Sequence, residues 1–156
     1  MRTIDELIVE SPTFQGLSDE QLKLIAGCAV NEHYEAGELL LREGDPAERF
    51  YLIRHGMIVL EMNAPGRGAL QIQTLGEGDV LGWSWLFAPH RWAMDGRTVQ
   101  ESSLVAFDGT CLRDKCEEDH ELGYELMKRF AANLIDRLQA TRLQLIDVYG
   151  RDSVTA

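Results

Sequence analysis

The amino-acid sequence predicts a mainly β domain of the sandwich or roll class, with helices on both sides of the β region. Two observations carry this prediction: short apolar segments alternate with glycine-containing turns up to about Asp108, and helical patterns lie before and after them. A chain of 156 residues with 45% apolar content is long enough to bury one core. We therefore expect residues 1–156 to form a single domain, with a helix and β roll over about 10–109 and C-terminal helices over 110–149.

A short helix is predicted before the β region. Ser18-Asp19-Glu20-Gln21 has the pattern of a capping box, in which the first and fourth side chains bond each other's backbone N–H groups. Apolar residues follow at Leu22, Leu24 and Ile25, and Gly27 provides the end of the helix.

Five short segments rich in aliphatic and aromatic residues predict the strands of the roll. Several strands at this spacing, separated by turns, favour a sandwich or roll over a parallel sheet with crossover helices. We expect Gly44 and Gly56 to hold turns at positive φ or to allow close backbone approach. The predicted strands are Glu38–Leu41, Phe50–Ile53, Met57–Met62, Leu70–Thr74 and Leu104–Phe107.

Two helices are predicted after the β region. Thr110 can cap a short helix that runs through Lys115. The stretch from about His120 to Tyr149 predicts one long helix, and Gly150 is a suitable residue to end it. The tail Arg151–Ala156 is short and polar, and we expect it to fray.

The long helix carries an apolar stripe with the spacing of a helix–helix interface. From Met127 to Val148 the steps are 3, 4, 4, 3, 4 and 3 residues, which average 3.5. Packing on the chain's own β core accounts for the first half, whereas further apolar residues at Ile135, Leu143 and Ile146 favour self-association of the second half. We therefore predict a homodimer. The predicted interface residues are Phe130, Leu134, Leu138, Thr141, Leu145 and Val148.

Charge and hydropathy exclude two classes of partner. The formal charge is −11, with 15 basic residues against 26 acidic ones, so no cluster of Lys and Arg is available to neutralise phosphates. No segment approaches the roughly 20 apolar residues that a membrane-spanning helix needs, and the N-terminus lacks the pattern of a signal peptide. We expect no binding to nucleic acid or membranes.

The cysteines indicate no metal or redox site. Cys28, Cys111 and Cys116 are odd in number and lack the spacing of zinc ligands. The prediction is three free thiols in a reducing cytoplasm.

No catalytic motif is present. An enzyme of the cupin class would need a His-x-His pair to bind its metal, and the four histidines, at positions 33, 55, 90 and 120, include no such pair. No Gly-x-Ser-x-Gly elbow and no sign of a Cys–His pair occur. We predict no catalytic residues, no metal ligands and no enzymatic activity, and a cupin-like metal enzyme remains a distant alternative.

Four segments together resemble the cyclic nucleotide-binding domain family, in particular the sensor domain of bacterial Crp–Fnr type regulators. The resemblance covers about residues 10–149 and implies a jelly-roll β barrel with flanking helices and a dimerising C-terminal helix. Full regulators of this type continue into a helix-turn-helix domain, and we expect none here because the sequence stops soon after the long helix. The segments are Phe14-x-x-Leu17-Ser18, Ala36–Pro46, Phe50–Gly56 and Leu75–Gly82.

The resemblance also places a phosphate-binding cassette, which in the family is a short helix and loop with the pattern Gly-Glu-x-Ala-Leu followed by Arg-x-Ala or Arg-x-Thr. There the helix N-terminus and the Arg bind phosphate, and the Glu accepts a bond from the ribose. Here Trp83 replaces that Glu, and an indole donates one hydrogen bond but accepts none. The resemblance therefore implies a degenerate cassette, with no resident cofactor and with cyclic AMP or cyclic GMP bound weakly if at all. Its residues are Gly82, Trp83, Ser84, Trp85, Leu86, Arg91, Trp92 and Ala93.

The residues of the cassette leave several interpretations open. Arg91 is either a ligand clamp or a surface charge paired with Asp95. The three tryptophans form either an aromatic ligand pocket or a packed core. Ser84 either bonds a ligand or caps the cassette helix, and the cap is favoured.

These observations together predict a non-enzymatic, dimeric regulatory module that senses a small anionic or aromatic ligand and acts on an unidentified protein partner. The alternative is a scaffold subunit without a ligand, in which tryptophan fills the pocket.

The charge generates a testable prediction about DNA. Because the chain has no phosphate-neutralising patch, duplex DNA at low salt should show no binding tighter than about 10 micromolar in a fluorescence anisotropy titration. Tight binding that weakens steeply with added salt would contradict it.

Overall fold

The computed structural model describes the backbone of residues 2–155 and the side chains of residues 2–150. The chain begins with α1 (Ile4–Glu10), the 3₁₀ turn η1 (Pro12–Phe14) and α2 (Asp19–Ala26). The predicted capping box is confirmed: Ser18 Oγ accepts from the backbone N of Gln21 at 3.1 Å, and Gln21 Oε1 accepts from the backbone N of Ser18 at 3.0 Å.

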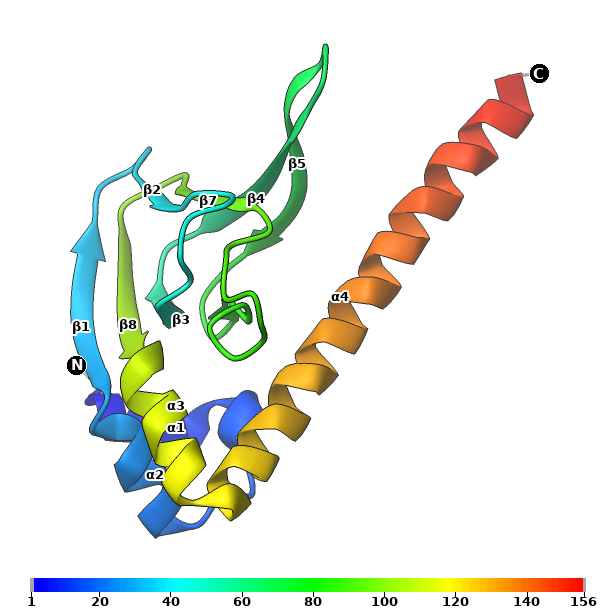
Figure 1. The fold of residues 1–156 in the computed structure, drawn as a ribbon. Helices are drawn as coiled ribbons and strands as arrows, with labels where there is room; N and C mark the ends of the chain where they lie inside the picture. The colour runs from blue at the N-terminus through cyan, green and yellow to red at the C-terminus, as the bar shows by residue number, and fades with distance from the viewer. Residues whose placement is uncertain (1, 156) are drawn as a thin grey trace.

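Two antiparallel four-stranded sheets face each other, and the predicted jelly roll with flanking helices is confirmed (Figure 1). The strand orders are β1-β8-β3-β6 and β2-β7-β4-β5. All five predicted strands appear, and β1, β6 and β7 are additional. The strands are β1 (Ala29–Tyr34), β2 (Leu39–Leu41), β3 (Arg49–His55), β4 (Ile58–Ala64), β5 (Gly68–Leu75), β6 (Val80–Leu81), β7 (Asp95–Thr98) and β8 (Ser102–Asp108).

The three additional strands lack the apolar signal of the others. β1 carries Asn31, Glu32 and His33, β7 reads Asp-Gly-Arg-Thr, and β6 has only two residues. Their conformation comes from pairing with β8, β3, β2 and β4, which a local pattern does not encode.

Strands β3 and β8 lie side by side and are buried on both faces. In β3, Phe50 and Leu52 pack toward the helices, whereas Tyr51 and Ile53 face the second sheet. β8 alternates in the same way along Leu104–Phe107. Their sheet therefore separates two cores, one between the sheets and one beneath the helices.

Aromatic rings fill the core beneath the helices. Phe50 stacks on Phe107 with ring centroids 4.3 Å apart and on Trp85 at 4.9 Å. Phe130 meets Phe50 and Trp85 edge-on at 5.1 and 5.3 Å and is only 1% exposed. The prediction that Phe130 belongs to a dimer interface is therefore wrong, because its ring completes the core of its own chain.

Helix α3 (Gly109–Glu118) begins one residue earlier than Thr110. The side chain of Asp108 caps it, accepting from the backbone N of Cys111 at 3.1 Å. The predicted cap at Thr110 is wrong because Asp108, at the end of β8, already fills that role.

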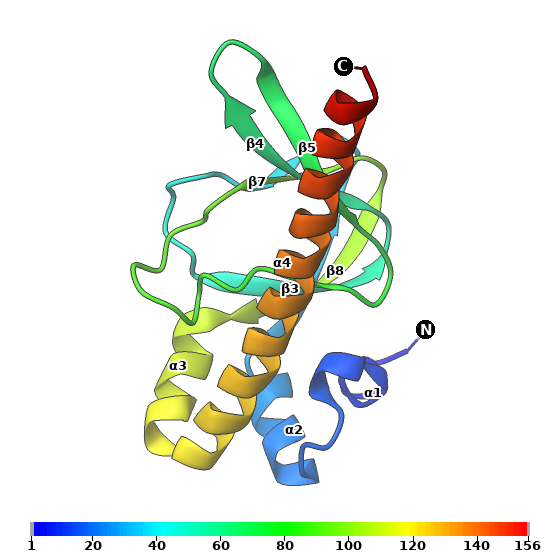
Figure 2. The same cartoon turned by 90° about the vertical axis from the view of Figure 1, so that its right-hand side faces the viewer.

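Helix α4 (His120–Thr155) crosses in front of both sheets (Figure 2). Its first half packs on the core through Leu122, Leu126 and Phe130, as predicted. The predicted end at Gly150 is wrong, since the helix continues to Thr155. Glycine in a helix costs only about 1 kcal/mol relative to alanine, which continued backbone bonding offsets. The tail was predicted to fray, but residues 151–155 are helical, and Ala156 lies outside the described residues.

Within the described part of the chain, no helix combines the length and the apolar character needed to cross a membrane.

Cys28 and Cys111 form a disulfide, so the prediction of three free thiols is wrong for these two residues; Cys116 is free. Pairing of β1 with β8 places Ala29 opposite Phe107, and the backbone N of Asp108 donates to the carbonyl of Cys28 at 2.9 Å. The register brings together cysteines that are 83 residues apart, which spacing alone does not reveal. The cysteines therefore no longer support a cytoplasmic location, which stays a prediction.

Gly44 and Gly56 adopt positive φ values of 89° and 114°, as predicted. Gly56 is also crowded: a Cβ atom there would lie 2.1 Å from the hydroxyl of Ser102. Gly37 has a similar φ of 86° but open space around it.

Gly56→Ala should lower the free energy of unfolding by about 2–4 kcal/mol, from backbone strain plus the clash with Ser102. Gly37→Ala is the matched control and should lose only the strain, about 1–2 kcal/mol. Urea unfolding of both variants checks this, and equal losses would contradict the contact at Ser102.

Candidate functional site

The cassette segment, residues 82–94 between β6 and β7, forms turns and no helix. The backbone N of Leu86 donates to the carbonyl of Trp83 at 3.2 Å, and that of His90 to Phe87 at 2.9 Å. The short helix implied by the resemblance is therefore absent, and the interpretation of Ser84 as its cap is wrong. Within the segment, the peptide bond between Ala88 and Pro89 is cis.

The segment lines a cavity of about 20 Å³. This volume holds about one water molecule. Five of the eight predicted cassette residues line it, together with strand residues and one residue of α4. The lining residues are Leu41, Leu60, Leu81, Gly82, Trp83, Ser84, Trp92, Ala93, Met94 and Arg137.

The indole of Trp92 packs closely against Gly82 at the wall of this cavity. A Cβ atom on Gly82 would lie 3.0 Å from this ring, so only glycine permits so close an approach. The backbone of Trp92 is held on both sides, by the N of Gly44 at 2.9 Å and by the carbonyl of Asp45 at 3.0 Å. Trp92 also borders a larger cavity of about 330 Å³, which Tyr51 lines too. Trp92 therefore belongs to the lining of both cavities.

Trp85 and Leu86 lie outside the cassette cavity. Trp85 is fully buried in the core beneath the helices, and Leu86 packs against the same core. Arg113 donates to the backbone carbonyl of Trp85. The indole N–H of Trp85 has no hydrogen-bond partner among the described residues. For Trp85 the packing interpretation holds, and the three tryptophans do not form one cluster.

Arg91 also lies outside the cavity, on the surface. Its Nη1 donates to the carbonyl of Gly44 at 2.8 Å. Asp95, the ion-pair partner considered for it, accepts instead from the backbone N of Glu43 at 2.7 Å. The guanidinium is thus bonded to the backbone, with no ion pair to Asp95.

Sequence reasoning missed Arg137, which reaches the cavity from α4. Its Nη2 donates to the carbonyl of Val80 at 2.8 Å. Burial lowers the pKa of the guanidinium, and the nearby carboxylate of Asp79 opposes this shift in part. Nothing in the sequence relates position 137 to the cassette, because the path of α4 across the sheets decides the contact.

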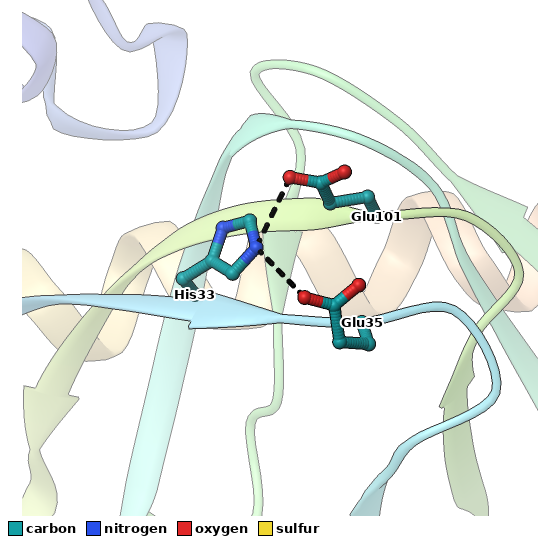
Figure 3. Close-up of side chains that lie close together, drawn as sticks. All are labelled: His33, Glu35 and Glu101. Atoms are coloured by element: carbon teal, nitrogen blue, oxygen red, sulfur yellow. Dashed lines mark ion pairs between the residues drawn. The ribbon is translucent and has the colours of Figure 1, made fainter.

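A second group of polar side chains gathers at the end of β1 (Figure 3). His33 Nε2 lies 3.1 Å from Glu101 Oε1 and 3.6 Å from Glu35 Oε1. The sequence predicted no metal ligands; the pairing of β1 with β8 brings Glu101 to His33 and Glu35, which are close together in the chain. All three side chains are exposed. Solvent screens ion pairs in such a position, and each contributes less than about 1 kcal/mol.

The family model of the cyclic nucleotide-binding domain matches residues 31–119. The chain is 24% identical over 149 residues to the CRP-like cAMP-activated global transcriptional regulator of Mycobacterium tuberculosis. That match covers 96% of this chain and 65% of the regulator, so the chain spans about two thirds of that relative's length.

Solved structures share the fold. A cyclic nucleotide-binding protein of Geobacter metallireducens is 27% identical, with a TM-score of 0.78 over 88% of this chain and 99% of that one. A cyclic nucleotide-binding domain from Methylobacillus flagellatus is 18% identical, with a TM-score of 0.79 over 92% of this chain and 81% of that one. Since the family model covers more than half of the sequence, including the whole cassette segment, the chain belongs to the cyclic nucleotide-binding domain family.

Proposed function

We propose that the chain is a non-enzymatic regulatory module, which senses a small anionic ligand at the cassette cavity and acts as a homodimer through α4. The observation that carries this proposal is the course of α4. The helix contributes Arg137 to the cavity and then continues outward with apolar side chains that the chain does not cover. A single rigid element thus joins a candidate ligand site to a candidate interface.

The cassette is degenerate with respect to cyclic nucleotides. Trp83 stands where a ribose acceptor is needed, and it cannot accept a hydrogen bond. The ring of Trp92 fills the space beside Gly82, and Arg91 bonds to the carbonyl of Gly44 rather than facing the cavity. A purine nucleotide would require both the ring and the arginine to move.

The outer half of α4 supports self-association. It runs beside the β4–β5 hairpin, where Gln144 Nε2 donates to the carbonyl of Ile72 at 2.8 Å. Leu138, Leu145 and Val148 are each about half exposed, at 49, 53 and 53%. Residues at the 3.5 spacing of a coiled coil are best covered by a second copy of the same helix. The predicted interface, without Phe130, would bury them.

Coupling between cavity and interface follows from these contacts. An anion bound beside the cassette segment would change the contact of Arg137 with Val80, and thereby the angle or rotation of α4. The dimer with α4 in its original position and the dimer with α4 shifted would then bind the ligand with different affinities. A ligand shifts the balance between two conformations only if it binds one of them more tightly.

A ligandless scaffold is the second candidate, and the closed cavity favours it. A space that holds about one water molecule gives a ligand no room unless Trp92 moves. The dimer surface is common to both candidates, so only ligand titrations separate them.

Calorimetry with cyclic AMP tests the degenerate cassette. We expect dissociation constants weaker than about 100 micromolar for the wild type, because losing the charged ribose acceptor costs about 1.5–3 kcal/mol. Trp83→Glu alone should gain nothing, since Trp92 still fills the space, whereas Trp83→Glu combined with Trp92→Ala should gain about tenfold or more. Low-micromolar binding by the wild type that is lost in Arg91→Ala would contradict the proposal.

Sedimentation at micromolar concentration tests the dimer, which should weigh twice the chain mass of 17.6 kDa. Leu138→Glu places a charge in a dry interface and should give monomers or insoluble protein. Gln139→Glu, at the adjacent exposed position off the stripe, is the matched control and should remain dimeric. A monomeric wild type at high concentration would contradict the proposal.

A further inference from the structure

The guanidinium of Arg137 is a cation with unused hydrogen-bonding capacity. An arginine side chain has five N–H donors, and Arg137 is bonded once, to the carbonyl of Val80. Among the described residues it forms no ion pair, although burial removes part of its hydration. A partly desolvated cation without a bonded counter-ion is stabilised by any anion that reaches it.

The surroundings of Arg137 differ on its two sides. On one side it borders an outer cavity of about 250 Å³, where the carboxylates of Asp79 and Asp136 would repel an anion. On the other side it borders the cassette cavity, whose other lining residues carry no charge. Ser84 supplies the one hydroxyl group there. An anion is therefore favoured on the cassette side.

We propose that Arg137 of α4 is the anion-binding residue of the cassette cavity, in place of Arg91, and that it binds the carboxylate or phosphate group of a small ligand. This inference rests on the proposed function, because it assigns the ligand class and the binding residue of the same site. A guanidinium binds both groups through paired N–H donors.

Space for the anion comes from movement of Trp92. The cassette cavity of about 20 Å³ admits one oxygen atom, and the remaining atoms of the ligand need the volume that the indole occupies. The indole would move toward the cavity of about 330 Å³ that Trp92 also lines. Binding therefore changes the environment of an indole, and tryptophan fluorescence reports it.

This assignment gives α4 a direct part in sensing. Arg91 lies on the surface and bonds to the loop at Gly44, so an anion there would contact only the β roll. An anion on Arg137 pulls on the helix that carries Leu138 and Leu145. The ligand and the proposed dimer interface then share one element.

The test is a titration of the full chain with inorganic phosphate and, separately, with acetate. Tryptophan fluorescence and the ¹⁵N-resolved side-chain Nε–H signal of Arg137 are followed. We expect saturable changes in both signals for the wild type. Arg137→Gln should weaken binding by about tenfold or more, because it removes the charge while an amide donor to Val80 remains. Arg137→Lys keeps the positive charge but lacks the paired N–H donors of the guanidinium, so it should bind with intermediate affinity.

Three further variants test whether binding depends on Arg137 and on the movement of Trp92. Arg91→Gln and Arg142→Gln remove one positive charge each, from the cassette surface and from an exposed position on α4, and should bind like the wild type. Trp92→Ala should strengthen binding by removing the ring that must move. Thermal unfolding monitored by circular dichroism confirms that each variant is folded.

Three outcomes contradict the inference. Loss of binding in Arg91→Gln with retention in Arg137→Gln assigns the anion to the cassette arginine, and the proposed sensing function then stands without this inference. Equal weakening in Arg142→Gln shows nonspecific charge attraction only. No saturable change with either anion, in the wild type or in Trp92→Ala, overturns ligand sensing itself and favours the scaffold.

Discussion

The antiparallel pairing of β3 with β8 is the contact on which the other parts of this structure depend. Six registered pairs, from Arg49–Asp108 to His55–Ser103, hold the two strands together with apolar side chains on both faces. One face stacks Phe50 on Phe107 beneath the helices, and the other forms the core between the sheets. Because both faces are buried, a slip by one residue would exchange the two cores, so the register is strongly specified.

The sheet that contains β3 and β8, which is buried on both faces, positions the cassette segment. β6 pairs with β3 and leads directly into Gly82, and β7 receives the chain after the cassette segment. Trp85 enters the core beneath the helices while Trp92 enters the core between the sheets. Two tryptophans seven positions apart thus anchor the segment in both cores. This anchoring explains why the cavity is closed without any helix in the segment.

Helix α4 contacts both the core beneath the helices and the cassette cavity. Phe130 fixes its first half against Phe50 and Trp85, which sets the direction in which the rest of the helix leaves the domain. About two turns further along, Arg137 reaches the carbonyl of Val80. Beyond that contact the apolar side chains are exposed, and burying them requires a surface that the chain itself does not provide.

The sequence by itself determined what short-range patterns encode: the capping box at Ser18, the five apolar strands, the positive φ at Gly44 and Gly56, and the long helix. The linear order of the glycine motifs was enough for the family and the jelly roll. Only the tertiary structure decided the disulfide of Cys28 with Cys111, the burial of Phe130 and the place of Arg137 at the cavity. Each of these depends on strand register or on the path of a helix across a sheet, and such contacts join residues far apart in the chain. Periodicity shows which face of an element is apolar, but the surface that covers that face is set by the packing of the whole domain.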